Sequence, residues 1–152
     1  MKEELFELVK QELENIELKR HQLIYIVHSS FKKDLLAISQ KLNIPYININ
    51  LELSKELMDI PINKRPRRVS QLVKQIIKNH QGKTLVLDHI EVLFDPNLKQ
   101  NPVLLLEDIS RNTILIVGWK GTSQNHKLIY GEPDHNEYYT YGNTEGVIIK
   151  DI

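Results

Sequence analysis

Three short runs of consecutive, mostly apolar residues constrain the fold of this chain most strongly. They lie at Leu23–Val27, Thr84–Leu87 and Thr113–Val117. A strand that is apolar on both sides is buried on both faces, which is typical of a parallel sheet covered by helices. Between these runs apolar residues recur at helical spacing, and the stripe from Val69 to Ile77, between the first and second runs, is the clearest. Alternating strands and helices therefore predict an α/β fold with three layers: a parallel sheet and helices on both of its faces.

Other patterns predict the remaining elements of a single domain of residues 1–152. Apolar residues at helical spacing predict an amphipathic helix within residues 1–20. Strict alternation of apolar and polar residues over 45–51 predicts a second strand, which a short helix follows. Asparagine followed by proline at 101–102 is typical of a helix start. We expect short strands and loops over 119–152.

Composition excludes several classes of site. The 152 residues correspond to about one domain. The absence of cysteine excludes disulfides, iron–sulfur clusters and thiolate zinc sites. Twenty basic and 20 acidic residues balance, so only a local patch can attract nucleic acid. The N-terminal segment carries acids instead of a signal-peptide core, and no apolar run is long enough to span a membrane. We therefore expect a cytoplasmic protein that does not contact a membrane.

Two carboxylates follow one of the predicted buried strands. Asp88 ends the strand that contains Leu85–Leu87, and Glu91 comes three residues later. Ligands of parallel sheets bind beyond the carboxyl ends of the strands. In P-loop NTPases an aspartate at this position holds Mg²⁺ and a nearby glutamate orients the attacking water. Asp88 and Glu91 are thus candidate catalytic residues, and Asp88 is the candidate Mg²⁺ ligand if a nucleotide binds. The structural alternative is that Asp88 caps the turn and Glu91 is solvated.

The segment after the first strand departs from the phosphate-loop pattern. A Walker A loop follows G-x-x-x-x-G-K-[ST], in which glycines let backbone N–H groups approach the phosphates. Residues 28–34 are His-Ser-Ser-Phe-Lys-Lys-Asp, and the first glycine of the chain is Gly82. The candidate nucleotide contacts in this segment are Ser29, Ser30, Lys32 and Lys33. Asp34 would repel phosphates, whereas it suits the first turn of a helix. The alternative is an ordinary strand-to-helix connection capped by a serine.

Two further features are expected at the same edge of the sheet. A basic cluster precedes the helix at residues 69–77, and it consists of Lys64, Arg65, Arg67 and Arg68 around Pro66. It either contacts phosphates of a nucleotide or of DNA, without sequence readout, or is a solvated loop. Trp119 leaves the last of the three buried strands at this edge. It is either a nucleotide contact or a buried anchor.

Several stretches together resemble one known family. They are Pro45–Ser54, Arg65–Val69, Leu87–Gln100, Ser110–Asn112, Gly118–Trp119 and Glu132–Tyr138. In these stretches the chain resembles the BrxF family, the small P-loop proteins of type 3 BREX phage-defence systems. The similarity extends over about residues 23–141, and the stretch Asp-x-Ile-Glu-x-Leu-Phe-Asp-Pro from Asp88 is its most specific part.

The resemblance implies a P-loop NTPase fold with a degenerate phosphate loop. It implies that Asp88 and Glu91 are the Walker B pair and that Lys33 is the only match to the Walker A lysine. It further implies a bacterial protein of antiviral defence whose partners are other BREX proteins, with self-association into a homo-oligomer as a further expectation.

Three hypotheses compete with a defence component that acts through partner proteins. The first is an active ATPase that uses Lys33, Asp88 and Glu91 with ATP and Mg²⁺ as cofactors. The second is an accessory protein that binds DNA nonspecifically through the basic cluster. The third is a silent scaffold without a cofactor. The glycine-free loop favours weak or no ATP hydrolysis over the first hypothesis, and the neutral net charge weakens the second.

Overall fold

The computed structural model describes residues 3–28, 34–124, 127–131, 139–142 and 144–150. Its α-helices are α1 (Glu3–Asn15), α2 (Asp34–Leu42), α3 (Ile49–Leu57), α4 (Val69–Asn79) and α5 (Pro102–Ile109). Short 3₁₀ helices are η1 (Ile16–Leu18), η2 (Ile62–Arg67), η3 (Glu91–Phe94) and η4 (Pro96–Leu98). The strands are β1 (Leu23–His28), β2 (Tyr46–Asn48), β3 (Thr84–Asp88), β4 (Ile114–Lys120), β5 (Thr122–Gln124), β6 (Lys127–Tyr130), β7 (Tyr139–Tyr141) and β8 (Val147–Lys150).

Within the described residues, five strands form one parallel sheet in the order β2-β3-β4-β1-β8. Every pair of neighbours in it is parallel, so the predicted parallel α/β sheet is confirmed. The register aligns Ile26 of β1 with Gly118 of β4, and Asn48 of β2 with Asp88 of β3. The carboxyl ends of β1, β3 and β4 therefore open onto the same edge, as the sequence predicted.

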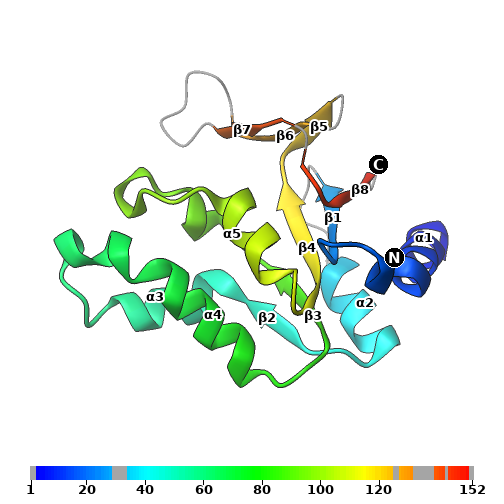
Figure 1. Ribbon diagram of the computed structural model, residues 1–152, viewed down its shortest axis with the longest axis horizontal. Helices are drawn as coiled ribbons and strands as arrows, with labels where there is room; N and C mark the ends of the chain where they lie inside the picture. Colours follow the sequence, from blue (N-terminus) through cyan, green and yellow to red (C-terminus); the bar gives the residue numbers. More distant parts are fainter. Residues whose placement is uncertain (1–2, 29–33, 125–126, 132–138, 143, 151–152) are drawn as a thin grey trace.

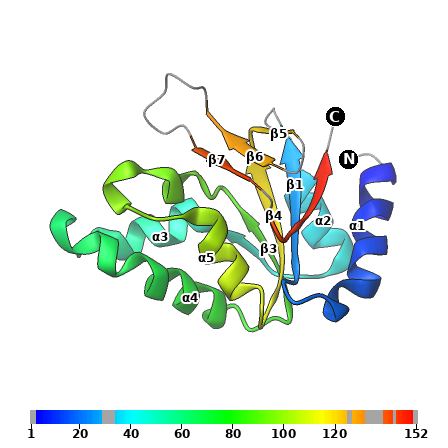
Figure 2. The same cartoon turned by 45° about the horizontal axis from the view of Figure 1, so that its top comes forward.

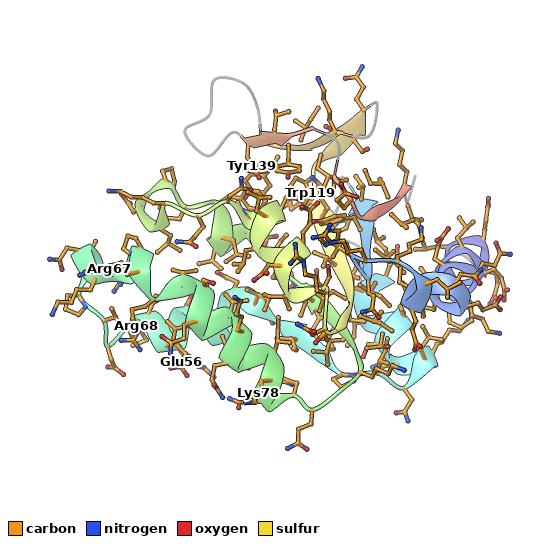
Figure 3. All side chains as sticks on the ribbon, in the orientation of Figure 1. Glu56, Arg67, Arg68, Lys78, Trp119 and Tyr139 are labelled. Carbon is orange, nitrogen blue, oxygen red and sulfur yellow. The ribbon has the colours of Figure 1, made fainter. Side chains whose placement is uncertain are left out.

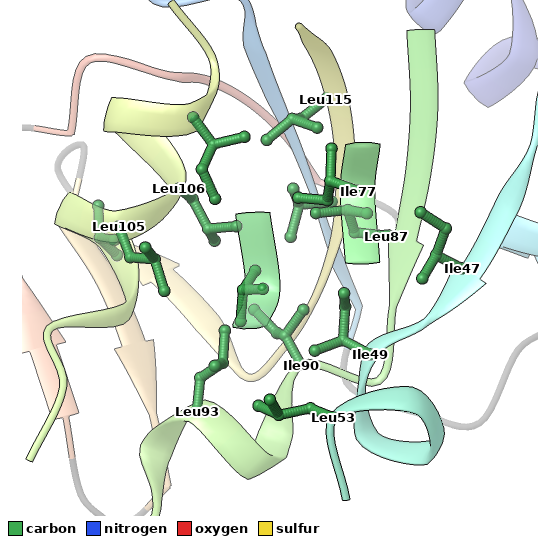
Figure 4. Packing of buried hydrophobic residues seen from close by; sticks show 14 of the residues in the cluster. Ile47, Ile49, Leu53, Ile77, Leu87, Ile90, Leu93, Leu105, Leu106 and Leu115 are labelled. Carbon is green, nitrogen blue, oxygen red and sulfur yellow. The ribbon is translucent and has the colours of Figure 1, made fainter. Parts of the chain in front are cut away.

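Helices cover both faces of the sheet (Figure 1). Side chains along each strand point alternately to the two faces. On one face, α1 and α2 pack on Ile24, Ile26, Val86 and Ile116. On the opposite face, α3, α4 and α5 pack on Tyr25, Leu87, Leu115 and others. Figure 4 shows Ile77 of α4 and Leu106 of α5 converging on Leu87 and Leu115 of the sheet. Burial of both faces explains why the strands contain consecutive apolar residues.

The strand predicted over residues 45–51 is wrong in its second half. β2 ends at Asn48, and α3 begins at Ile49. Asn48 is the N-cap of α3, and its side-chain oxygen accepts a hydrogen bond from the backbone N–H of Leu51 at 2.9 Å. An asparagine at this point satisfies a helix N–H group that has no partner within the helix, so a helix can start although the apolar–polar alternation continues.

Beyond β4 the chain forms a small antiparallel sheet in the order β5-β6-β7. Figures 1 and 2 place it beyond the carboxyl end of β4, and β8 then returns to pair with β1 in the main sheet. Contacts between aromatic rings hold the small sheet in place, and the rings are those of Trp119, Phe94, Tyr130 and Tyr139. The Phe94 and Tyr130 rings stack with centroids 4.0 Å apart, and Trp119 meets Phe94 edge to face.

None of the helices in the described part of the chain combines the length and the apolar character that crossing a membrane requires.

Candidate functional site

The order of strands creates a switch point at the carboxyl edge of the main sheet. After β1 the chain continues to α2 on one face, whereas after β3 it continues through η3 and η4 to α5 on the other face. β4 lies between these two strands. The carboxyl end of β4 therefore lies between two connections that leave toward opposite faces of the sheet, and α/β sheets bind ligands at such a switch point.

Asp88 lies at this switch point with its carboxylate held from two sides. The Tyr46 hydroxyl, from β2, donates a hydrogen bond to Asp88 Oδ2 at 2.6 Å. The backbone N–H of His89 donates one to Asp88 Oδ1 at 3.0 Å. The Asp88 side chain is only 14% exposed. Two donors on different elements fix the orientation of this carboxylate, and each oxygen keeps a lone pair for a further partner.

The Tyr46 hydroxyl remains a hydrogen-bond donor over a wide pH range. Burial raises the pKa of Tyr46 well above its usual value, and the hydrogen bond to Asp88 with the charges of Asp88 and Glu91 raises this pKa further. A tyrosine that keeps its proton donates steadily to the carboxylate. Asp88 is therefore held as an oriented acceptor beside a neutral phenol.

Gly118 gives the Asp88 carboxylate the space that it occupies. A Cβ atom added at Gly118 would lie 2.8 Å from Asp88 Oδ1 and 3.2 Å from Cγ of Leu35. Real Cβ atoms essentially never approach an oxygen that closely, so any side chain at position 118 would displace Asp88. Leu35 belongs to the first turn of α2, so the carboxylate and the start of α2 meet above β4.

His89 and Glu91 complete the polar surroundings of Asp88. His89 has a positive φ of 54°, an uncommon conformation for a residue other than glycine. Its Nε2 lies 3.6 Å from Asp88 Oδ2, and its Nδ1 lies 3.9 Å from Glu91 Oε1. Its carbonyl oxygen accepts a hydrogen bond from the backbone N–H of Asn50 at 2.9 Å, which ties this turn to the start of α3. The site thus holds an imidazole between two carboxylates.

The side-chain ligands around Asp88 can form at most part of a metal site. Among the residues that the structure describes, no group of three or more histidine, cysteine, aspartate or glutamate side chains can hold a metal ion. Mg²⁺ needs fewer protein ligands, because it keeps several waters and uses one or two carboxylates together with substrate phosphates. Asp88 fits that role by position and free lone pairs, and Glu91 is 31% exposed nearby.

The predicted phosphate-contacting residues Ser29, Ser30, Lys32 and Lys33 lie outside the described residues. Asp34 follows them directly and is the first residue of α2, where it is only 8% exposed. A carboxylate in the first turn of a helix is stabilised by the helix dipole. The structural role expected for Asp34 at the start of the helix therefore fits its position.

Trp119 is part of the hydrophobic core. Its side chain is completely buried, and its indole N–H donates a hydrogen bond to the carbonyl oxygen of Ile129 at 3.0 Å. It points to the face of the sheet that α5 covers, whereas Gly118 faces α2. These contacts favour the buried-anchor alternative over a nucleotide contact. Trp119 fixes the small sheet to the main one.

The basic cluster separates into two parts. Lys64, Arg67 and Arg68 are exposed. Arg65 is half-buried, and its Nε donates a hydrogen bond to the carbonyl oxygen of Ile60 at 2.9 Å. Arg65 thus holds the connection between α3 and α4, while the other three cations face solvent. Figure 3 shows Arg67 and Arg68 at the end of α4 that is remote from β3.

Sequence reasoning missed Tyr46 as a residue of the site. The signal was present, because Tyr46 is on the polar side of the alternating segment, two residues before the strand ends. Residues two apart on a strand face the same side, so Tyr46 faces the same side as Asn48. Asn48 pairs with Asp88, and the Tyr46 side chain therefore lies on the same face of the sheet as Asp88. Knowing the pairing of β2 with β3 was necessary to use this signal.

Comparison with protein-family models, with curated proteins and with solved structures finds no match for this chain. The functional conclusion therefore depends on the residue pattern and on the geometry around Asp88.

Proposed function

We propose that this chain is a component of a BREX-type anti-phage defence system, with an NTPase-like domain that acts through partner proteins. The observation that carries the proposal is the position of Asp88. Its carboxylate lies at the switch point of a parallel sheet, oriented by Tyr46 and the His89 N–H group and accommodated by Gly118. The resemblance of the surrounding stretch to the BrxF family connects this position with a Walker B aspartate.

In this proposal Asp88 and Glu91 are the metal-binding half of a phosphoryl-transfer site. Asp88 would hold Mg²⁺, directly or through water, and Glu91 would orient a water molecule. Bound Mg²⁺-ATP would supply the transferable phosphoryl group. The phosphate half of the site would have to come from residues 28–34, which contain no glycine. Phosphoryl transfer depends on positioning and charge neutralisation, so half a site supports little hydrolysis.

The expected result is weak or no ATP binding by the isolated chain, with hydrolysis near background. The measurement is titration calorimetry with ATP, with and without Mg²⁺, together with phosphate release. The informative variant is Asp88→Asn, which keeps the side-chain shape and removes the charge. Asp59→Asn is the matched control, because Asp59 is an exposed carboxylate beyond the end of α3.

The same variants distinguish the proposal from its rivals in cells. We expect a BREX strain that lacks this chain to regain phage resistance when it receives the wild type, Asp88→Asn or Asp59→Asn. Loss of resistance with Asp88→Asn alone, together with micromolar ATP affinity of the wild type, would establish the active ATPase instead. Failure of the wild type to restore resistance would contradict the assignment to BREX.

A DNA-binding accessory is the second candidate, because Arg67 and Arg68 are exposed on one side of the molecule. Neither arginine depends on the site at Asp88, so this function and the defence proposal can hold together.

A further inference from the structure

The outer face of α4 is polar along its whole length and opens into two adjoining grooves. One groove, of about 460 Å³, is lined by Arg67, Ser70, Gln71, Lys74, Gln75 and Lys78. The five positions on α4 repeat at intervals of three and four residues and form a single stripe on the helix, and Arg67, the last residue of η2, extends this stripe at its N-terminal end. The second groove, of about 610 Å³, shares Lys74 and Lys78 with the first and continues to Arg111 in the connection between α5 and β4. Figure 3 shows Arg67 and Lys78 near the two ends of α4.

The charge of this double groove is positive although the whole chain is neutral. Four cationic side chains line it, namely Arg67, Lys74, Lys78 and Arg111. The one carboxylate among the lining residues is Asp108, which forms an ion pair with Lys74 at 2.9 Å. Arg67, Lys78 and Arg111 are exposed. A cleft lined by one sign of charge concentrates counter-ions of the opposite sign.

We propose that the face of α4 between Arg67 and Arg111, which we call the α4 groove, binds the phosphate backbone of duplex nucleic acid. Arg67 and Lys78 are 11 residues apart, which is about 16 Å along a helix. One strand of a duplex presents a phosphate every 3.4 Å of its axis, so the stripe spans about four or five phosphates. Gln71 and Gln75 lie between the cations and supply side-chain N–H donors for phosphate oxygens.

The composition of the α4 groove favours duplex nucleic acid over two other anionic partners. Protein interfaces have an apolar core, but the lining of the first groove contains only polar and cationic side chains. Single strands are held by bases stacking on aromatic rings, and neither groove is lined by an aromatic residue. Duplex backbones need neither feature and are bound by polar, positively charged surfaces. The inference does not depend on Asp88 or on the proposed defence role.

The test measures binding of a fluorescent 20-base-pair duplex by anisotropy over 50 to 200 mM salt. The triple variant Arg67→Gln, Lys78→Gln and Arg111→Gln removes three cations of the α4 groove. The control triple variant Lys10→Gln, Lys127→Gln and Lys150→Gln removes three exposed cations elsewhere. Both triple variants change net charge equally, and circular dichroism melts verify that both fold.

We expect the groove variant to lose about tenfold or more in affinity and the control less than threefold, because only groove cations release counter-ions. The plot of log affinity against log salt should become shallower by about 2–3 for the groove variant alone. Equal losses in the two variants, or no duplex binding by the wild type at 50 mM salt, would overturn the proposal. A single strand of equal length or polyglutamate that binds as tightly as the duplex would overturn the assignment to duplex nucleic acid.

Discussion

At the scale of single residues, the hydrogen bond between Tyr46 and Asp88 links the two strands at the sheet edge. The donor is on β2 and the acceptor ends β3, and their oxygens are 2.6 Å apart. Hydrogen bonds to ionised acceptors are stronger than neutral ones. This contact therefore both stabilises the pairing of a three-residue strand and sets the direction of the candidate catalytic carboxylate.

Tyr46→Phe should lower the free energy of unfolding by about 1–2 kcal/mol at neutral pH, since it removes a donor from a largely buried carboxylate.

This loss of stability in Tyr46→Phe should depend on pH. The pKa of Tyr46 is raised in the folded chain, so its stabilising contribution is complete below about pH 10, the tyrosine pKa in an unfolded chain. Above that pH the unfolded chain loses the proton first, and the difference between wild type and variant should shrink. Urea unfolding at pH 7 to 11 measures it; a difference that stays constant up to pH 11 would contradict this explanation.

Residue patterns were sufficient to select Asp88 and Glu91 as candidates, because both follow an apolar run at a strand end. These patterns were not sufficient to show that the Asp88 carboxylate accepts hydrogen bonds from two donors. Neither Tyr46 nor Gly118 is near Asp88 in sequence, and both reach it only through strand pairing. Likewise, the hydrogen bond of Arg65 to Ile60 depends on how the chain folds back before α4.

At the scale of elements, the boundary between β2 and α3 shows how one side chain can end a strand. Ile47 and Ile49 are both fully buried, as alternation over a strand predicts, but they belong to different elements. A helix can bury the same residue when its first turn packs on the core. Periodicity alone cannot separate these cases over so few residues, whereas the N-cap asparagine can.

Asn48→Ala should destabilise the protein by about 1 kcal/mol, since the N–H group of Leu51 loses its acceptor. Asn48→Asp should retain most of the stability because it retains the capping oxygen. Asn50→Ala is the matched control, because Asn50 is exposed within the same helix turn. We expect it to be neutral or slightly stabilising, as alanine favours helix interiors. Thermal unfolding of the three variants provides the comparison, and equal losses for Asn48→Ala and Asn50→Ala would show that the cap is unimportant.

The longer elements were predictable for a different reason. α4 and β3 each have one dominant apolar pattern over their full length, and their ends coincide with the predicted ones to within two residues. The sequence predicts short strands over 119–152, but not that β8 joins the main sheet. Its pairing with β1 joins residues more than 120 positions apart, for which no local pattern exists.

At the scale of the whole molecule, the last strand is held in the main sheet by a buried carboxylate from α5. Glu107 is 6% exposed, and its Oε2 accepts hydrogen bonds from the backbone N–H of Glu145 at 2.8 Å and the Thr144 hydroxyl at 3.2 Å. Directly afterwards, Gly146 passes against the ring of Tyr25, where an added Cβ would lie 2.8 Å from the ring carbon. Glu107 thus fixes the turn that leads into β8.

Glu107→Ala should release β8 while the rest of the sheet stays folded. The variant leaves the N–H group of Glu145 without its acceptor inside the protein, and we expect a loss of about 2–3 kcal/mol in unfolding free energy. β8 pairs within the described sheet only with β1, so its amides should exchange with deuterium faster than those of β3.

Two further variants serve as controls. Glu107→Gln keeps an acceptor oxygen and should show a smaller change. Asp108→Ala is the neighbouring control: it breaks only a solvent-exposed ion pair with Lys74, which contributes less than about 1 kcal/mol. Uniformly faster exchange across β3 and β8 in Glu107→Ala would mean that Glu107 stabilises the domain as a whole instead of fixing its last strand.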